Sequence, residues 1–496
     1  MSTSPTSHPG RNCQGFHGQR PRASVSGRMI PNDNRCLLRH LLPLDPPDIA
    51  ILMVPLPAQG HLNQLLQLSF RISSSYPDIP IHFASSATHN HQARLRSTLS
   101  VATTNIIFHD LVSPPFPSPP PNPNSSHKFP SHLLPAFRHA NEHLCGPISD
   151  LICYLSSSIR RLVVINDSLM ASSIQRAFSL PNAESYTFHS VSAFTIHWFL
   201  NGSSVDDKEE LLRCFPPEFL EFARAHYEFK KLSSGNIFNT CRVVEGAYMD
   251  MLELQSHRKH WALGPFNPVM THRPFGRCQC IEWLGMQEPN SVLYVSFGTT
   301  TAFSDQQVRE LAIGLENSTH KFIWVLREAD RGDIFGKGEV REMVLPKGYE
   351  ERIERRGLGL VVREWAPQME ILGHRSTGGF MSHCGWNSCM ESISMGVPVA
   401  AWPIHSDQIK NAELLTNVLG VGILVRKNKK ERDNVVGADT VEGAVRELMG
   451  SKEGAEARKR AEDIGINIRK STEEVGIGAS SPLTEMDSFV AHILRN

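Results

Sequence analysis

A buried strand and a helix meet in the stretch Gly378-Gly-Phe-Met-Ser-His-Cys-Gly-Trp-Asn-Ser-Cys-Met-Glu-Ser-Ile-Ser-Met-Gly-Val-Pro398. Residues 378–382 are small or apolar, which is typical of a short buried strand. The Asn-Ser pair at 387–388 offers good N-cap residues, so we expect a helix over 388–395. The glycine after it suits the position that follows the last helical residue, and the proline prevents the helix from continuing.

The junction between this strand and this helix is a predicted phosphate-binding site. The N-terminus of a helix presents unpaired backbone N–H groups and the positive end of the helix dipole. His383, Asn387 and Ser388 lie at the same end and add side-chain donors. Together these groups are suited to a diphosphate.

The first folding signals along the chain repeat the strand–turn–helix pattern. Residues 49–56 form a continuous apolar run, which is typical of a strand buried on both faces. A glycine turn follows, and 62–72 has helical apolar spacing. His61 therefore lies at the carboxyl end of the first strand, where open α/β sheets bind ligands. A second apolar run, 162–165, ends just before Asp167, which we place at the same edge of the sheet.

Strands and helices alternate in both halves of the chain, which predicts an α/β fold with two Rossmann-like domains. Further helices are expected over 211–232 and 408–419. A proline- and glycine-rich connection separates the two series. We therefore predict five segments: a disordered extension over 1–47, a first domain over 48–263, a linker over 264–288, a second domain over 289–479, and a C-terminal helix over 480–496 that packs back on the first domain.

Composition and charge exclude several classes of function. The chain has 496 residues, enough for two or three domains, and its 50 Lys and Arg residues balance its 50 Asp and Glu residues. This balance gives no global attraction to nucleic acid or to an anionic membrane. No apolar run reaches the roughly 18–20 residues that span a bilayer. The ten cysteines lack paired metal-ligand spacing and indicate a reducing compartment.

Residues 1–47 differ in composition from the rest of the chain. They contain six arginines, no lysine, few acidic residues and many Ser, Pro and Gly residues. This composition is typical of a disordered segment. It is also similar to that of an organelle transit peptide. We expect a cytoplasmic protein with an unstructured extension, and import into a plastid is the alternative.

A longer motif surrounds the opening stretch. It runs from Trp-Ala-Pro-Gln-Met-Glu-Ile-Leu-Gly-His at 365–374 through His-Cys-Gly-Trp-Asn-Ser at 383–388 to Trp-Pro-Ile-His-Ser-Asp-Gln at 402–408. It resembles the whole nucleotide-sugar signature of the plant family 1 UDP-glycosyltransferases, and the match has no gap. The resemblance extends from about residue 48 to the C-terminus. It implies the GT-B fold, in which two Rossmann-like domains face each other across a cleft.

The resemblance also implies a catalytic pair. Pro-Ala-Gln-Gly-His-Leu-Asn at 57–63 is similar to the family's catalytic-histidine segment, which makes His61 the base that takes the acceptor's proton. Asp167 matches the partner aspartate, which orients the imidazole and stabilises its protonated form. From the residues alone, His61 also fits a histidine at the start of a helix, and Asp167 also fits an N-cap.

A set of UDP-sugar contacts follows from the same resemblance. Trp365 would stack on uracil, while Gln368 and Glu391 would reach the ribose. Asp407 and Gln408 would bind the sugar hydroxyls, and a glutamine at this last position accompanies glucose donors in the family. We therefore expect UDP-glucose. The complete predicted donor set is Thr299, Trp365, Ala366, Gln368, His383, Trp386, Asn387, Ser388, Glu391, Asp407 and Gln408.

The predicted chemistry is an inverting transfer. An acceptor hydroxyl that displaces UDP directly should invert the anomeric centre. A retaining mechanism would need a second carboxylate as nucleophile, and the sequence does not indicate one. Helix N-terminus and side-chain donors would stabilise the leaving diphosphate, so we expect no metal and no cofactor besides the co-substrate UDP-glucose. Neither first strand–helix turn carries Gly-x-Gly-x-x-Gly, which argues against a dinucleotide oxidoreductase.

Several stretches resemble one subgroup of the family, the zeatin (cytokinin) O-glycosyltransferases. They are 87–94, 118–124 with 129–133, 164–171, 261–268 and 296–301. We therefore predict a monomer that glucosylates a small apolar acceptor, the side-chain hydroxyl of zeatin, and so produces a storage form of the hormone. The alternatives are a phenolic or flavonoid acceptor and, in another class, a UDP-sugar-binding protein without turnover. The intact catalytic pair argues against the latter.

Overall fold

The computed structural model describes residues 48–97, 105–116, 129–130, 132–202, 204–267, 278–299, 301, 303–327, 344–426, 435–473 and 484–495. The extension predicted over 1–47 lies outside the described residues, as does the segment 118–124. Residues Pro46–Asn496 form one compact unit that holds two sheets.

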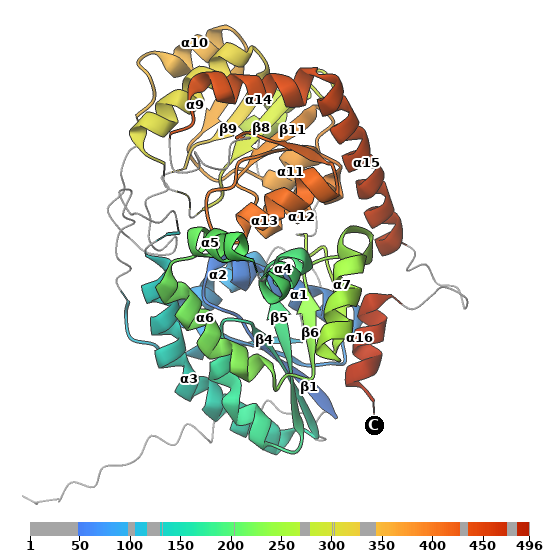
Figure 1. Ribbon diagram of the computed structural model, residues 1–496. Helices are drawn as coiled ribbons and strands as arrows, with labels where there is room; N and C mark the ends of the chain where they lie inside the picture. The colour runs from blue at the N-terminus through green and yellow to red at the C-terminus, as the bar shows by residue number, and fades with distance from the viewer. Residues whose placement is uncertain are drawn as a thin grey trace, which may run out of the picture. The chain divides into compact units, whose positions relative to one another are not determined.

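Within the described residues, the first sheet has seven parallel strands in the order β3-β2-β1-β4-β5-β6-β7 (Figure 1). All six residues of the interior strand β1 are buried, as its continuous apolar run predicted. Ile51 packs into one hydrophobic layer and Leu52 into the other. The strands are β1 Ile49–Val54, β2 Ile81–Ser86, β3 Ile106–Leu111, β4 Arg161–Asp167, β5 Ala183–His189, β6 Gly235–Phe238 and β7 Lys259–Ala262.

Helices cover both faces of the first sheet. The helices α1 and α16 contribute to the layer that contains Ile51, whereas α3, η1, α5 and α6 contribute to the layer that contains Leu52. The helices of this part are α1 Gln59–Ser75, α2 Ala87–Ser97, α3 Leu133–Ser158, the 3-10 helix η1 Ala171–Ser179, α4 Ala193–Asn201, α5 Val205–Cys214, α6 Pro217–Lys230, α7 Arg242–Ser256 and α16 Glu485–Ile493.

The second sheet has six parallel strands among the described residues, in the order β10-β9-β8-β11-β12-β13. Two parallel sheets with helices packed on them confirm the predicted α/β class, because parallel strands need helical crossovers on their faces. The strands are β8 Val292–Ser296, β9 Lys321–Val325, β10 Gly359–Val362, β11 Thr377–Ser382, β12 Val399–Ala401 and β13 Gly422–Leu424.

The second sheet also has helices in its hydrophobic layers. One of them, α8, lies inside the range predicted as a linker, and its Cys280 and Leu284 pack with Tyr294 of β8. The helices of this part are α8 Gln279–Gly285, α9 Asp305–Ser318, α10 Tyr349–Arg355, α11 Gln368–Leu372, α12 Trp386–Met395, α13 Gln408–Glu413, the π-helical turn η2 Leu414–Val418, α14 Ala438–Gly450 and α15 Lys452–Glu473.

Two helices begin earlier than the sequence predicted. Helix α12 has Gly385 as its N-cap, so Asn387 and Ser388 lie in its first turn and do not cap it. The chain reaches this start because Cys384 adopts a left-handed conformation with φ 64°. Helix α1 begins at Gln59, which places His61 in its first turn.

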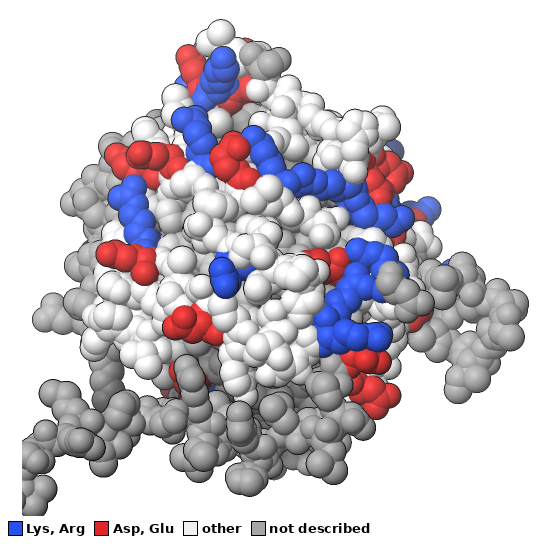
Figure 2. Space-filling model, turned by 90° about the horizontal axis from the view of Figure 1, so that it is seen from below, with Lys and Arg blue, Asp and Glu red and all other residues white. Residues whose placement is uncertain are grey.

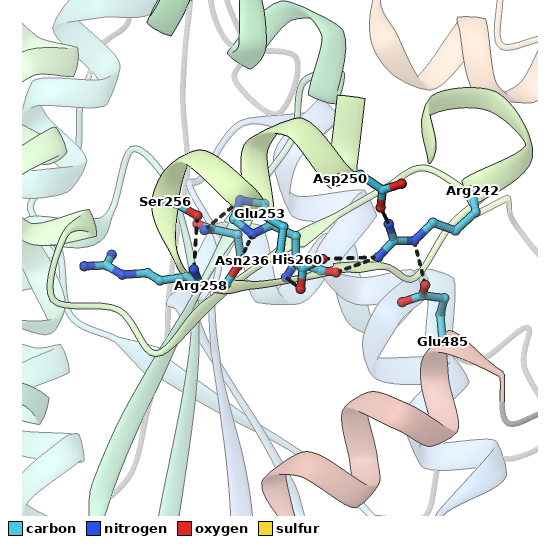
Figure 3. A network of polar contacts seen from close by, with 8 residues as sticks. All are labelled: Asn236, Arg242, Asp250, Glu253, Ser256, Arg258, His260 and Glu485. Carbon is cyan, nitrogen blue, oxygen red and sulfur yellow. Dashed lines mark hydrogen bonds and ion pairs between the residues drawn. The ribbon is translucent and has the colours of Figure 1, made fainter. Parts of the chain in front are cut away.

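Helix α16 packs on the first sheet. Phe489 is fully buried and makes edge-to-face contacts with Tyr186 and Trp261, at ring-centroid distances of 5.3 and 5.2 Å. At the start of the helix, Glu485 accepts a hydrogen bond of 2.8 Å from Arg242 Nε (Figure 3). The same guanidinium donates to Asp250 of α7 at 2.5 Å, so this network joins α16 to α7.

Charged side chains of both signs are mixed on one face of the described part. On the face that Figure 2 shows, basic and acidic side chains lie next to one another over the described part. This arrangement agrees with the equal numbers of basic and acidic residues in the sequence.

Candidate active site

A cavity of about 1090 Å³ is lined by residues that follow strands of both sheets. His61 and every member of the predicted donor set line it. Asp167 is fully buried behind His61. The structure therefore brings together, at one cavity, the residues that the sequence analysis assigned to the acceptor's proton and to the UDP-sugar.

His61 and Asp167 form a hydrogen-bonded pair. His61 Nδ1 lies 2.7 Å from Asp167 Oδ2, and 23% of the His61 side chain is exposed. Asp167 is the last residue of β4, and its second oxygen accepts from the backbone N–H of Leu169 at 2.9 Å. The carboxylate therefore both orders the turn after the strand and orients the imidazole. With Nδ1–H bonded to Asp167, Nε2 is the nitrogen that can take a proton.

Ser190 is a third member of this cluster, and the sequence analysis did not identify it. Ser190 Oγ lies 3.0 Å from His61 Nδ1. The residue follows β5, the neighbour of β4 in the sheet. Its backbone carbonyl accepts from Gln64 Nε2 at 3.3 Å, which ties it to α1, the helix that carries His61.

The charge environment favours protonation of His61. Burial lowers the pKa of His61, but the charge of Asp167, their hydrogen bond and the charge of Asp407 outweigh burial and leave the pKa raised above its ordinary value. A base with a raised pKa holds the abstracted proton more firmly. The arrangement can therefore remove a proton from a hydroxyl group in the cavity.

The predicted phosphate site lies at the N-terminus of α12. His383 is buried against two glycine backbones, since a Cβ at Gly298 or Gly385 would lie 2.7 or 2.5 Å from its Nε2. Burial lowers the pKa of His383 to about 4, so its imidazole is neutral near pH 7. Thr299 follows Gly298 and also lines the cavity. Asn387, in the first turn of α12, donates from Nδ2 to the carbonyl oxygen of Gly60 at 3.0 Å.

The predicted base and ribose contacts line another part of the cavity wall. Trp365 is 62% exposed, whereas the neighbouring Ala366 is buried. Gln368 Nε2 donates to Glu391 at 2.5 Å and to Ser388 Oγ at 3.1 Å. Burial raises the pKa of Glu391 to about 7, although the Gln368 hydrogen bond opposes this shift.

The predicted sugar contacts lie at the start of α13. Burial raises the pKa of Asp407 to about 6, against a hydrogen bond from Asn411 and the charge of His61. Asp407 Oδ2 accepts from Asn411 Nδ2 at 2.7 Å. Gln408 uses Oε1 to accept from the backbone N–H groups of Ile404 and His405, at 2.9 and 3.0 Å.

Trp386 has a structural contact of its own. Its indole N–H donates to the backbone carbonyl of Asn239 at 2.8 Å, and 3% of the residue is exposed. Asn239 follows β6 of the first sheet. Trp386 therefore connects the donor motif, the signature over residues 365–408, to the first sheet. One edge of the Trp386 ring lines the cavity.

Aromatic side chains line the part of the cavity that belongs to the first sheet and its helices. Phe215 and Phe219 stack with a ring-centroid distance of 4.7 Å and an interplanar angle of 11°. Phe129 packs against Phe219 at 4.9 Å, and Phe199 meets Phe215 at 5.7 Å. All four line the cavity. Such a wall is suited to flat apolar or aromatic molecules.

Comparisons with known proteins identify the family. Residues 47–268 match the model for "Glycosyltransferase, N-terminal domain", and residues 276–452 match the model for "UDP-glucoronosyl and UDP-glucosyl transferase". The chain is 51% identical over 458 residues to a zeatin O-glucosyltransferase of Phaseolus lunatus, covering 90% of this chain and 97% of that protein. The chain belongs to the UDP-glycosyltransferase family. As a member, this enzyme transfers a sugar from a UDP-sugar to a small-molecule acceptor.

Two further comparisons agree with this assignment. This glycosyltransferase is 49% identical to a zeatin O-xylosyltransferase of Phaseolus vulgaris, covering 91% of this chain and 99% of the relative. Its fold matches that of a UGT transferase from Siraitia grosvenorii in complex with UDP. The TM-score is 0.71 at 25% identity, covering 90% of this chain and 100% of the other. The fold therefore belongs to the GT-B class of plant glycosyltransferases, as the signature implied.

The described residues contain no group of three or more His, Cys, Asp and Glu side chains arranged to hold a metal ion. None of their helices combines the length and the apolar character that crossing a bilayer requires.

Proposed function

We propose that this glycosyltransferase moves glucose from UDP-glucose to the side-chain hydroxyl of zeatin, with inversion at the anomeric carbon. The observation that carries the proposal is the His61–Asp167 pair, 2.7 Å apart, beside a cavity that the donor motif also lines. The 51% identity to a protein named zeatin O-glucosyltransferase supports the choice of acceptor.

In this mechanism His61 acts as the general base. Its Nε2 takes the proton of the acceptor hydroxyl while Nδ1–H remains bonded to the side chain of Asp167. The acceptor oxygen forms a bond to the anomeric carbon as the bond from that carbon to the diphosphate breaks. UDP leaves from the opposite face, so an α-linked donor gives a β-linked product.

The leaving diphosphate would be stabilised at the N-terminus of α12. Backbone N–H groups and the helix dipole favour negative charge there, and Asn387, Ser388 and the neutral His383 add side chains at the same place. We propose that this set replaces a metal ion and that no resident cofactor takes part. Full activity in the presence of excess EDTA would support this part of the proposal, and restoration by Mg²⁺ after its loss would contradict it.

Recognition of glucose would rest on Asp407 and Gln408. Both line the cavity at the start of α13. The relative at 51% identity is named for glucose transfer, and the relative at 49% identity is named for xylose transfer. Donor preference is therefore tested directly, with UDP-glucose and UDP-xylose as separate substrates.

The aromatic wall supports a flat acceptor. Phe215 and Phe219 stack on each other on the proposed acceptor side. The ring centroids of Phe137 and His61 are 6.4 Å apart. A purine ring could rest on such a wall while its apolar side chain carries the hydroxyl toward the base. This arrangement needs no charged partner for the acceptor.

The deciding experiment is an acceptor panel. The purified enzyme is incubated with UDP-glucose or UDP-xylose and, separately, cis-zeatin, trans-zeatin, a flavonol or a simple phenol. We expect β-glucosides of a zeatin, loss of at least about 10³-fold in kcat for His61→Ala, and no loss for His91→Ala, which changes an exposed histidine. Transfer only to the phenolic acceptors would contradict the zeatin assignment, and an active His61→Ala would contradict the role of the base.

A further inference from the structure

Asn411 lies where helices of the two sheets meet. It belongs to α13, four residues after Asp407, and its side chain is fully buried. Helix α13 packs on α4 (Figure 1). Ile196 and Phe199 of α4 line the cavity. Asn411 itself is not one of the residues that line the cavity. Asn411 therefore connects the donor side of the cavity to the acceptor side from a position outside the cavity lining.

Hydrogen bonds engage both ends of the Asn411 amide. Nδ2 donates to Asp407 Oδ2 at 2.7 Å and to the backbone carbonyl of Cys384 at 3.0 Å. Oδ1 lies 2.8 Å from Ser192 Oγ and 3.2 Å from Thr195 Oγ1, and these two hydroxyls lie 2.7 Å from each other. Each hydroxyl has one proton, so one hydroxyl bonds the other while the amide oxygen accepts from this pair, and both amide N–H groups are used.

The chemistry of the partners determines the orientation of the amide. The Asp407 carboxylate and the Cys384 carbonyl can only accept, so the NH₂ group must face them. The amide oxygen is left for the hydroxyls of Ser192, the N-cap of α4, and of Thr195 in its first turn. An aspartate at 411 would place two carboxylates together, and a leucine would leave buried polar groups unpaired.

The neighbouring residue joins the same helices independently. Lys410 Nζ lies 2.9 Å from Glu210 of α5 and 4.0 Å from the ring centroid of Trp198 of α4, and 4% of the lysine is exposed. These contacts hold α13 against α4 and α5. Asn411 therefore meets Ser192 and Asp407 in a fixed geometry.

We propose that Asn411 is a positioning residue for sugar transfer. It holds the Asp407 carboxylate in the orientation that meets the sugar hydroxyls, and it anchors that carboxylate to α4 on the acceptor side. This inference rests on the sugar contact of Asp407 in the proposed function. Its distinctive consequence is that removing the Ser192 hydroxyl, which lies outside the cavity lining, weakens recognition of the sugar but not of UDP.

The test compares binding of UDP-glucose with binding of UDP, both by calorimetry and without an acceptor. For Asn411→Leu we expect the Kd of UDP-glucose to rise about tenfold, because a buried hydrogen bond to a charged group is lost. Ser192→Ala should raise it about threefold, and in both variants the Kd of UDP should stay within about twofold. Asn417→Leu, at an exposed asparagine six residues further along, is the matched control and should change neither.

Two further variants separate the possible failures. Asp407→Asn tests the sugar contact itself: if it leaves the Kd of UDP-glucose unchanged, that contact and this inference both fail. If Asp407→Asn weakens UDP-glucose binding but Ser192→Ala and Asn411→Leu do not, the positioning role is overturned and the proposed function stands. Thr195→Val keeps the N-cap of α4 while removing one hydroxyl, so it decides the question if the other variants do not fold. Equal weakening of UDP and UDP-glucose would indicate a general structural role and would overturn the inference.

Discussion

Asn387 donates a hydrogen bond to the carbonyl oxygen of Gly60, the residue that precedes His61, at 3.0 Å. The asparagine belongs to the donor motif and the glycine to the first turn of α1, which carries the base. The proposed donor contact and the proposed base are therefore linked by one hydrogen bond. This contact joins a helix of the second sheet to a helix of the first at the cavity that both line.

Asp167→Asn should lower the activity. It should also move the acidic limb of the pH–rate profile to lower pH. Asp167 raises the pKa of His61 against the effect of burial, and the base works only when neutral. Without the carboxylate the pKa falls, so the acidic limb of kcat/KM should move to lower pH. We expect kcat to fall by about 10²–10⁴-fold, because an amide does not support the same tautomer or stabilise the imidazolium.

The pH–rate profile from about pH 5 to 9 checks this prediction. Asp439→Asn, at an exposed aspartate in the first turn of α14, serves as the control and should leave the profile unchanged. An acidic limb that stays in place or moves to higher pH in Asp167→Asn would show that this carboxylate does not set the pKa of His61.

Gly298→Ala should weaken donor binding. Gly298 has φ 73°, and a Cβ there would lie 2.7 Å from Nε2 of the buried His383. The methyl group would displace the imidazole from the phosphate site, so we expect the Kd of UDP to rise at least about tenfold, together with a loss of roughly 1 kcal/mol of stability for the left-handed backbone. Gly285→Ala is the matched control, because its Cβ meets nothing within 4 Å. Calorimetric titration with UDP measures the effect, and unchanged affinity in Gly298→Ala would rule out His383 as a phosphate contact.

Trp365→Ala should weaken UDP binding with little effect on folding. The side chain lines the cavity and is 62% exposed, so little core packing depends on it. Stacking of a base on an aromatic ring contributes about 1–3 kcal/mol, which corresponds to roughly a 5- to 150-fold rise in Kd. Trp365→Phe should retain most of the affinity, since it keeps an aromatic face. If the alanine variant bound UDP as well as the wild type, uracil would have to lie elsewhere.

Phe489→Ala should destabilise the protein without changing the donor site. The ring is fully buried between Tyr186 and Trp261, and truncating such an aromatic residue costs about 3–5 kcal/mol of unfolding free energy. Leu494→Ala, at a residue 50% exposed, should change that free energy by less than about 0.5 kcal/mol. Denaturant unfolding compares the two variants. A stability loss for Phe489→Ala no larger than that for Leu494→Ala would mean that α16 does not contribute to the core.

Strand ends and helix ends could be predicted from local signals. Residues 378–382 were predicted as a buried strand, and β11 spans Thr377–Ser382 with every residue buried. Gly396 was predicted to follow the last helical residue, and it has φ 75°. Such positions are predictable because buried parallel strands are continuous apolar runs and because glycine adopts the left-handed conformation without a steric penalty.

Positions where tertiary contacts compete with local preference were predicted incorrectly. Asn387 and Ser388 were expected to cap α12, but their side chains contact Gly60 and Gln368 instead. The helix expected over 211–232 is two helices, since α6 begins at Pro217 in a Pro-Pro pair that interrupts it. Strand β5 was not predicted, because Ala-Glu-Ser-Tyr-Thr-Phe-His lacks the continuous apolar run by which the other buried strands were identified.

Most of the candidate site could be located only through the family resemblance. The roles of His61 and Asp167 came from motifs, and the structure places the two side chains in contact. Ser190 and Asn411 carried no local signal. Their key partners lie 129 and 219 positions away in the sequence, for Ser190 with His61 and for Asn411 with Ser192. Contacts over such separations depend on the completed fold.

The docking of α16 on the first sheet affects the order in which the protein can fold. Residues 485–493 are synthesised long after β1, yet Phe489 packs in the same layer as Ile51 of β1. On the ribosome, the first half of the chain must therefore wait with part of its apolar surface uncovered until residues 485–493 have been synthesised. Premature termination shortly before residue 484 would leave that layer open in every molecule, and such chains should be aggregation-prone and rapidly degraded although all the proposed catalytic residues are present.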